Sequence, residues 1–590
     1  MAFATYLYFL PQRCAFFATF PHKAQILRNL ETIFVYSKRK NMQNYLNLLN
    51  QTIKKNWESP ALCFFNGEQI TFEGLAKHIA RFHLLFEKSG IKAGDKIAIC
   101  AKNTDRWAVS FLSVTTYGTV IVPILADFLP ESVASLVDHS DSIVLFTDKE
   151  IWNRLPLDKM PKIRAAINVD DFSLLYSSDQ NFTNIFAGLD ESFNSAYPNG
   201  FTREDVKFRV DTDNLDDLEI INYTSGTTSA PKGVMLSYRN VSASIEFAHS
   251  HIACTPGQTI VSMLPMAHIY GLVFELLYPL SGGCTIYYLG KSPAPSLLLK
   301  AMKAVKPYLV LTVPLVMEKI YKSSVKPALS KPAVKILTHI PGVNKLIYKK
   351  VRESLDAAFG GNVQEYIMGG AALNPEVEHC FKKIGLHYTV GYGMTEAAPL
   401  LAYEHWYNYA FGSCGKKVDC ADVRIDSEDE HRIAGEIQAK GDNICLGYYK
   451  NEEATAAAFT EDGYLRTGDL GTIDKAGNIY IRGRSKNMIL GPNGQNIYPE
   501  ELEALVNSQP YVTESVVVDR GSKLVALVYL DQDGMKKAGL DDEAISDVPQ
   551  NIVLNVNRSL PAYSRLTKVE VVLEPFAKTP KMSIKRFLYK

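Results

Sequence analysis

At 590 residues, the chain is long enough to bury a large core and to form more than one domain. Hydrophobic residues make up 47% and charged residues 21% of the sequence, which is typical of a globular protein rather than a disordered or membrane-spanning one. Lys and Arg together equal Asp and Glu at 63 each. No net positive field therefore indicates a nucleic acid partner, and any phosphate binding must be local.

The cysteines and the first residues bear on cellular location. Nine cysteines are scattered, without a C-x-x-C pair or a histidine cluster at zinc spacing, and their odd number favours a reducing, cytoplasmic location. Residues 1–41 are aromatic and lack basic residues before their apolar run, which makes a poor signal peptide. We interpret them as an N-terminal extension, untranslated or poorly ordered, with Met42 as the initiator. An organelle transit peptide is the alternative.

Short apolar runs alternate with helical periodicity through the first half of the chain. The pattern predicts strands in "KIAICAKN", "TVIVPI" and "SIVLFTD", and helices in "DRWAVSFLSVTTYG" and "ESVASLVDHS". This alternation predicts a largely parallel sheet covered by helices. The uncharged stretch from Trp107 to Ala126 divides into a helix and a strand, so we interpret it as buried core and not as a membrane span.

Later segments extend this α/β pattern and then depart from it. Residues 165–215 are polar and turn-rich and lead into a strand predicted in "LEIINYTSG", and further strand and helix candidates follow through "YLVLTVPLVMEKIY" and "VQEYIMGGAAL". Residues 415–483 read as short strands with frequent Gly and Asp, which predicts a small antiparallel barrel or sheet. The helix "PEELEALVNS" and the strands "ESVVVD" and "KLVALVYL" then predict a compact α+β domain. We place the boundary near Lys486, between domains 42–484 and 485–590.

The segment "YTSGTTSAPKGVMLSYRN", Tyr223 to Asn240, carries the strongest chemical signal. Glycine and small hydroxyl residues follow a predicted strand, so backbone N–H groups can converge on one concavity, and Lys232 adds a positive charge. This is a phosphate cradle but not a Walker A loop, because Pro231 and Gly233 replace required residues. The alternative is an ordinary turn. The cradle residues are Thr224, Ser225, Gly226, Thr227, Thr228 and Lys232.

With its Pro-Lys-Gly ending, this segment resembles the signature loop of the adenylate-forming superfamily, and the resemblance extends from about residue 60 to the C-terminus. One departure is Ser229, where that family usually has Gly. The resemblance implies a large N-terminal region of two α/β subdomains plus a small β-barrel, followed by a mobile α+β C-terminal domain. It also implies that the protein uses ATP and coenzyme A as co-substrates and Mg²⁺ as a cofactor.

Further stretches resemble the family's other motifs in the right order. In "LPMAHIYG", the resemblance places His268 beside the acyl carboxylate; alone, such a histidine is more often a core side chain. "MGGAAL" offers a flat backbone edge to adenine. In "GYGMTE", the implied roles are adenine stacking, α-phosphate binding and magnesium binding. The residues concerned are Gly369, Gly370 and Ala371, then Gly391, Tyr392, Gly393, Thr395 and Glu396, with Glu396 as the metal ligand.

The motifs near the domain boundary complete the implied nucleotide site. In "DGYLRTGDLG", Asp469 is implied to accept hydrogen bonds from ribose hydroxyls. In "IRGRSKNMI", Arg484 is implied to contact ribose or phosphate, and Lys486 stands at the position of the family's hinge. Alone, each stretch would read as a solvated turn.

The C-terminal segment "KTPKMSIKRFLYK" departs from the family, because Ser583 stands where a lysine that stabilises charge on the phosphate is expected. Lys581 and Lys585 flank this position, and we favour Lys585 as the substitute. The alternatives are weakened adenylation or a non-catalytic protein that binds nucleotide.

"LTVPLVMEKIY", Leu311 to Tyr321, looks like a segment of the long-chain fatty acid branch. We therefore expect a fatty acid–CoA ligase that forms an acyl-adenylate, releases pyrophosphate and transfers the acyl group to coenzyme A. An acyl carrier protein as acceptor, or an aryl acid as substrate, are alternatives. The lysine-rich residues that follow, up to Arg352, predict either peripheral contact with membrane lipid or a solvated helical face.

Overall fold

The computed structural model describes residues 42–224, 231–290, 295–491, 495–521, 523–579 and 584–589. Residues 45–590 cluster into one compact unit. The expectations for residues 1–41 concern a segment outside the described residues. Within the described ranges, no helix is long and apolar enough to cross a membrane.

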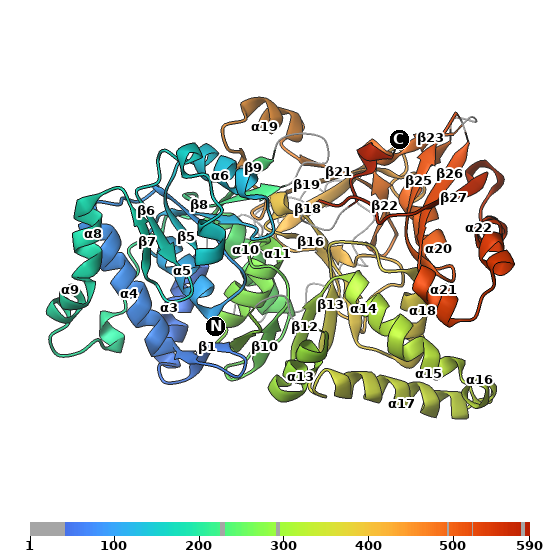
Figure 1. The fold of residues 1–590 in the computed structure, drawn as a ribbon, viewed down its shortest axis with the longest axis horizontal. Helices are drawn as coiled ribbons and strands as arrows, with labels where there is room; N and C mark the ends of the chain where they lie inside the picture. Colours follow the sequence, from blue (N-terminus) through green and yellow to red (C-terminus); the bar gives the residue numbers. More distant parts are fainter. Residues whose placement is uncertain are drawn as a thin grey trace, which may run out of the picture. The chain divides into compact units, whose positions relative to one another are not determined.

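An eight-stranded sheet organises the first half of the chain (Figure 1), in the order β20-β9-β8-β4-β3-β5-β6-β7. Its central strands, from β8 to β6, are parallel, as the alternating pattern predicts. The bounds are β3 Lys96–Cys100, β4 Val120–Ile124, β5 Ser142–Thr147, β6 Ala165–Asn168, β7 Leu174–Ser177, β8 Leu218–Thr224, β9 Lys232–Ser237 and β20 Gly447–Tyr448.

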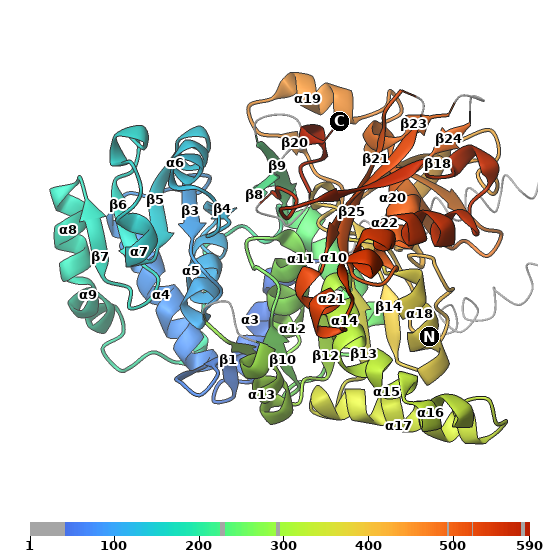
Figure 2. The same cartoon turned by 45° about the vertical axis from the view of Figure 1, so that its right-hand side comes forward.

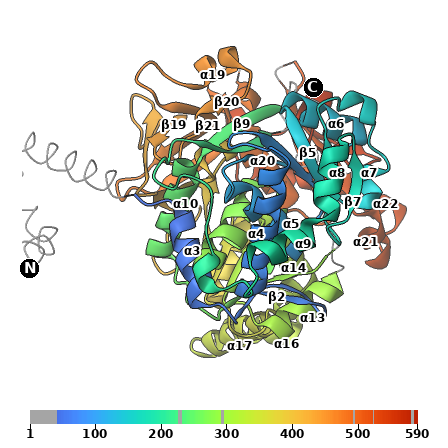
Figure 3. The ribbon, with the colours of Figure 1, turned by 90° about the vertical axis from the view of Figure 1, so that its left-hand side faces the viewer.

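Helices cover this sheet, as Figure 3 shows from its side. Several of them begin with a polar side-chain cap: the Thr104 hydroxyl accepts the N–H of Trp107 at the start of α5. Trp107 is fully buried, which agrees with the stretch from Trp107 to Ala126 as core. The bounds are α4 Phe72–Lys88, α5 Asp105–Thr115, α6 Pro130–His139, α7 Lys149–Trp152, α8 Gln180–Ala187 and α9 Leu189–Ala196, with 3₁₀ turns at Leu157–Lys159 and Arg203–Asp205.

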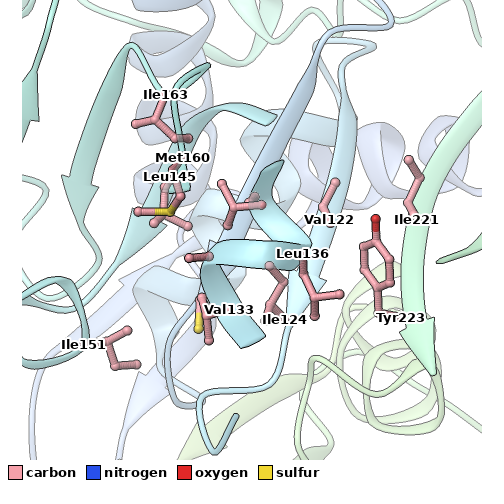
Figure 4. Packing of buried hydrophobic residues seen from close by; sticks show 14 of the residues in the cluster. Val122, Ile124, Val133, Leu136, Leu145, Ile151, Met160, Ile163, Ile221 and Tyr223 are labelled. Carbon is pink, nitrogen blue, oxygen red and sulfur yellow. The ribbon is translucent and has the colours of Figure 1, made fainter. Parts of the chain in front are cut away.

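The core beneath α6 fixes the strand that leads into the predicted phosphate cradle. Val133 and Leu136 of α6 lie over β4 (Figure 4), and the same buried cluster includes Ile221 and Tyr223 of β8. Burial of side chains of this size stabilises the fold by about 1.5 to 3 kcal/mol each. The end of β8 is therefore a rigid base for the residues that follow it.

Two further sheets have the orders β10-β11-β1-β2 and β12-β13-β14, and the latter is parallel. Their strands are β1 Pro60–Phe64, β2 Gln69–Thr71, β10 Thr259–Ser262, β11 Thr285–Tyr288, β12 Leu309–Thr312, β13 Glu365–Met368 and β14 Tyr388–Val390. The accompanying helices are α3 Tyr45–Lys55, α10 Tyr238–His251, α11 Ile269–Gly271, the π-helix η4 Leu272–Leu277, α12 Tyr278–Ser281, α13 Pro295–Val305 and α18 Pro375–Ile384. Parallel pairing brings the ends of β13 and β14, and hence the two glycine motifs after them, to one edge.

A helical segment separates β12 from β13. The stretch "YLVLTVPLVMEKIY", in which strand and helix candidates are predicted, is a strand as far as Thr312, and Pro314 then begins a helix. The helices are α14 Pro314–Ile320, the π-helix η5 Tyr321–Val325, α15 Lys326–Ser330, α16 Pro332–Leu337 and α17 Val343–Ala358.

Residues 415–483 are antiparallel, as expected. They contribute to an open four-stranded sheet β18-β19-β21-β22 and a three-stranded sheet β15-β16-β17, joined by an isolated bridge between Lys416 and Asn478. The bounds are β15 Tyr392–Gly393, β16 Leu400–Tyr403, β17 Lys416–Lys417, β18 Ala421–Asp426, β19 Gly435–Gly441, β21 Leu465–Ile473 and β22 Ile479–Arg484, with the 3₁₀ turn η6 at Thr395–Ala397 and α19 at Glu452–Ala458.

The last hundred residues form the α+β arrangement that the sequence predicts (Figure 2), with a hydrophobic core of their own. Their sheet has the order β25-β26-β27. The bounds are η7 Ser485–Asn487, β23 Ile489–Leu490, β24 Asn496–Ile497, α20 Pro499–Asn507, β25 Val512–Asp519, β26 Leu524–Leu530, α21 Gln532–Lys537, α22 Asp542–Asn557, β27 Lys568–Val572, and 3₁₀ turns at Ala562–Ser564 and η9 Arg586–Leu588. A domain boundary near Lys486 stays a prediction.

Candidate active site

The predicted phosphate cradle joins two paired strands. β8 and β9 are antiparallel, and Thr224 pairs with Lys232 at the end of the ladder. A side chain at Gly233 would come within 2.8 Å of Ile221, so only glycine fits without displacing the core. The cradle residues Ser225, Gly226, Thr227 and Thr228, and the departure at Ser229, lie outside the described residues.

Lys232 and Glu396 meet at one tyrosine. The ammonium of Lys232 lies 4.8 Å from the centre of the Tyr448 ring, and the Tyr448 hydroxyl donates to Glu396 Oε1 at 2.9 Å. Burial raises the pKa of Tyr448, so its hydroxyl stays protonated and remains a donor. Tyr448 is in place because β20 pairs with β9. The sequence motifs did not identify this residue.

A second group joins Tyr392, Asp469 and Arg484. The Tyr392 hydroxyl donates to Asp469 Oδ2 at 2.8 Å, and Arg484 Nε lies 2.7 Å from Oδ1. Residues Asp469 and Arg484 pair across β21 and β22. Burial raises the pKa of Asp469, while Arg484 and Tyr392 oppose the rise. The ring of Tyr392 is only 6% exposed, so adenine stacking stays a prediction.

The motif "GYGMTE" supplies Tyr392 to one group and Glu396 to the other. Residues 391–396, here called the strut, therefore connect the two groups. Gly391 N–H donates to the carbonyl of Met368 at the end of β13, at 2.8 Å. A Cβ at Gly393 would collide with the carbonyl oxygen of Pro399, so this close approach requires glycine. Thr395, half-buried, begins the turn that carries Glu396.

The motif "MGGAAL" follows β13 at the same edge of its sheet. Gly369 N–H donates to the Thr312 carbonyl at 3.1 Å, and a Cβ there would lie 3.3 Å from the Tyr270 ring. Gly370 has a φ of +86°, a conformation that favours glycine. Gly370 and Ala371 are exposed. They form an accessible backbone edge of the kind that adenine binding would need.

His268 stands at the start of α11, at the end of a turn that buried side chains support. Glu275 Oε2 accepts the N–H groups of Met263 and Leu264, each at 2.9 Å, and the Ser262 hydroxyl at 3.1 Å. Asn103 adds further bonds: its Nδ2 donates to the Leu264 carbonyl at 2.6 Å and its Oδ1 accepts the Met266 N–H at 2.9 Å. Sequence reasoning missed Glu275 and Asn103, although an acidic residue within the apolar run "LVFELL" is a signal.

Of the predicted C-terminal residues, the structure describes Lys486 and Lys585, and neither is brought to these groups. Lys486 is exposed in η7. The backbone N–H of Lys585 donates to the Ala577 carbonyl at 2.8 Å, and within the described ranges no contact joins its side chain to the Glu396 or Asp469 groups. Lys581 and Ser583 lie outside the described residues. The substitute for the missing lysine therefore stays a prediction.

Glu396 is a suitable ligand for magnesium only together with a phosphate. Its carboxylate is largely buried and one oxygen accepts from Tyr448. In the parts of the chain that the structure describes, no group of three or more His, Cys, Asp or Glu could hold a metal ion. Magnesium commonly binds one or two carboxylates plus substrate phosphates and water, so a single carboxylate linked through Tyr448 to Lys232 at the start of β9 fits that role.

Comparisons with known proteins agree with this arrangement. The AMP-binding enzyme family model matches residues 49–449, and the AMP-binding enzyme C-terminal domain matches residues 486–589. A long-chain-fatty-acid–CoA ligase of Mycobacterium bovis, FadD15, is 27% identical over 477 residues, covering 76% of this chain and 75% of the relative. Long-chain-fatty-acid–CoA ligase 1 of Saccharomyces cerevisiae is 26% identical over 552 residues, covering 86% and 76%.

Solved structures share the fold. ATP-bound MatB from Rhodopseudomonas palustris superposes with a TM-score of 0.71 at 21% identity, covering 92% of this chain and 97% of that one. A fatty acyl CoA synthetase of Mycobacterium tuberculosis superposes with a TM-score of 0.61 at 22% identity, covering 93% and 97%. The predicted α/β fold with a small C-terminal domain is confirmed. The family match, which spans more than half of the sequence, confirms the resemblance: the chain belongs to the AMP-binding enzyme family.

Proposed function

We propose that this chain is an AMP-forming acid–thiol ligase that activates a long-chain fatty acid with ATP and transfers the acyl group to coenzyme A. The observation that carries the proposal is that the strut 391–396 connects two groups of side chains. One group consists of Lys232, Tyr448 and Glu396. The other consists of Tyr392 and Arg484 around the buried carboxylate of Asp469. The curated relatives, which are named long-chain-fatty-acid–CoA ligases, support the substrate class.

The groups suit the first half-reaction. A carboxylate oxygen of the fatty acid attacks the α-phosphorus of ATP, and the bond to pyrophosphate breaks. In this proposal, Lys232 and Thr395 contact the phosphates and offset the charge that develops on them in the transition state. Asp469 accepts hydrogen bonds from the ribose hydroxyls, and Arg484 opposes the rise in the pKa of Asp469 that burial causes. Magnesium held by Glu396 would screen the charge of the triphosphate.

The second half-reaction exchanges the oxygen of AMP for sulfur. The thiolate of coenzyme A attacks the acyl carbon of the mixed anhydride, and AMP leaves. We propose that rotation of residues 485–590 about Lys486 separates the two steps. Substituting Lys486→Pro should slow thioester formation more than adenylate formation. Equal slowing of both half-reactions would contradict the hinge.

Ser583 favours a second candidate, a nucleotide-binding protein without catalysis, because this position lacks the lysine expected of the family.

An acyl carrier protein as the acceptor would leave every nucleotide contact unchanged, so comparing its phosphopantetheine thiol with coenzyme A as substrates decides between the two acceptors. A chain-length series that includes aryl acids tests the substrate class.

Fatty-acid-dependent ATP–pyrophosphate exchange, without coenzyme A, tests the proposal on protein that starts at Met42. Exchange should be robust, and loss in Lys585→Ala but not Lys581→Ala would assign the missing role to Lys585. Lys537→Ala, an exposed lysine of α21, is the matched control and should exchange normally. Binding of ATP without exchange for any acid would contradict the proposal and support the non-catalytic candidate.

A further inference from the structure

Residues 319–352, here called the basic arm, carry nine basic side chains and no acidic one, in a chain whose formal net charge is zero. The arm covers the end of α14, η5, α15, α16 and the first part of α17. Such a run is unusual where the rest of the surface balances its charges. The basic residues are Lys319, Lys322, Lys326, Lys331, Lys335, Lys345, Lys349, Lys350 and Arg352.

Most of this charge is uncompensated. Three of the nine form ion pairs: Lys326 with Glu376 at 2.9 Å, Lys349 with Glu353 at 3.7 Å, and Arg352 with Asp356 at 4.0 Å. For the other six, the described residues provide no ion-pair partner within 4.0 Å. These six are Lys319, Lys322, Lys331, Lys335, Lys345 and Lys350.

Large aliphatic side chains are exposed among these lysines. Ile336 and Leu346 are each 68% exposed, Ile340 is 43% exposed and Leu337 is 40% exposed. All four lie between residues 336 and 346, and on α17 Leu346 is three and four residues from Lys349 and Lys350, so they share a helical face. Single exposed apolar residues need no explanation, but a cluster within a basic segment indicates an interaction surface.

Contacts with α18 and the turn after it hold the arm at both ends. The Tyr321 hydroxyl donates to Glu376 Oε1 at 2.8 Å, and Arg352 Nη1 donates to the Gly385 carbonyl at 3.2 Å. A cavity of about 490 Å³ lies between the arm and α18. In Figures 1 and 2, α16 and α17 run along the lower edge of the fold. The middle of the arm is therefore presented outward on a fixed support.

We propose that the basic arm docks on the surface of an anionic lipid bilayer, with Ile336, Leu337, Ile340 and Leu346 entering the headgroup region and the lysines contacting lipid phosphates. A nucleic acid offers phosphates but no apolar layer, and an acidic protein surface leaves the aliphatic side chains in water. An anionic bilayer offers phosphates to the lysines and an apolar layer to the aliphatic side chains, because amphipathic helices bury their apolar face several ångströms into it. The contact is peripheral, and it rests on the proposed function only in that a long-chain acid dissolves in such a bilayer.

Vesicle co-sedimentation of the full chain, without substrates, tests the proposal. The chain should bind phosphatidylcholine vesicles that contain phosphatidylserine, bind pure phosphatidylcholine vesicles weakly, and lose binding in high salt. The variant K331Q/K335Q/K345Q/K350Q should bind the anionic vesicles more weakly by a factor of about thirty or more. The control K92Q/K149Q/K207Q/K475Q removes the same charge from exposed lysines on other elements and should bind as the unchanged chain does.

The variant I336S/L346S keeps every lysine and should weaken binding about tenfold per side chain. Equal binding to neutral and anionic vesicles, or equal losses in the arm and control variants, would overturn the proposal. A concentration-dependent dimer that I336S/L346S abolishes, with no vesicle binding, would assign the surface to a second copy instead. Pyrophosphate exchange with a soluble acid, measured on the same proteins, keeps a failure of docking distinct from a failure of catalysis.

Discussion

Replacing Glu275 tests how a buried carboxyl supports the turn that ends at His268. Burial raises the pKa of Glu275 to about 8, from a usual value of 4.5, although three hydrogen bonds oppose the rise. The side chain is thus neutral at pH 7, with Oε2 accepting all three bonds and Oε1 without a hydrogen-bond partner among the residues that the structure describes. Glutamine has the shape of this neutral form, so Glu275→Gln should retain the turn.

The magnitude follows from proton linkage. Between pH 4.5 and 8 the folded chain holds a proton on Glu275 that the unfolded chain has released, so stability falls as pH rises. The fall approaches about 1.4 kcal/mol per pH unit, or about 3 kcal/mol from pH 5.5 to 8. Glutamine does not titrate, so Glu275→Gln should gain about 3 kcal/mol relative to the unchanged chain over this range.

Guanidinium unfolding of the two proteins, in parallel from pH 5.5 to 8, measures this difference while the contributions of other groups cancel. Glu275→Ala is the contrasting variant: it leaves three buried donors without an acceptor and should cost about 3 to 6 kcal/mol. The rate of fatty-acid-dependent ATP–pyrophosphate exchange of Glu275→Ala should fall together with its stability. A difference between Glu275 and Gln proteins that stays constant with pH would refute the reasoning.

Three other predictions concern the two groups and a thiol pair. Asp469→Asn should weaken AMP binding about tenfold at pH 8 by calorimetry; because burial raises the Asp469 pKa, affinity should fall on acidification in the unchanged chain but not in the variant. Tyr448→Phe removes a hydroxyl bond to Glu396 and should raise the magnesium concentration needed for half-maximal exchange about tenfold, while unfolding stays similar. Cys254 and Cys284 have sulfurs 3.1 Å apart, so a mild thiol oxidant should lower the mass by two hydrogen atoms, and Cys284→Ser should prevent this.

The apolar runs predicted the central strands well because those strands are buried on both faces. Every residue of β4 is buried, which leaves a continuous apolar signal in the sequence. The order of the sheet was not predictable from local pattern: β4 lies between β3 and β8, and β20 joins from far along the chain. The polar stretch 165–215 also contains α8 and α9, whose short amphipathic runs resemble loops.

The motifs named the candidate residues, which stay predictions, but not the side chains that contact them in the structure. Asp469 and Glu396 were identified from their neighbours in sequence, whereas Tyr448 reaches Glu396 through strand pairing that no local motif encodes. Asn103 and Glu275 likewise act on a turn from separate elements. Supporting residues of this kind depend on tertiary contacts, so a single sequence gives little signal for them.

The strut 391–396 has a consequence for how ligands affect one another. Tyr392 joins it to the carboxylate of Asp469, and Glu396 joins it to Lys232 through Tyr448. Under the proposed assignment of ribose to Asp469 and magnesium to Glu396, a ligand that displaces the strut at one end would change the geometry at the other. Such a coupling free energy is reciprocal: if ribose strengthened magnesium binding by some factor, magnesium would tighten the binding of ribose by that same factor.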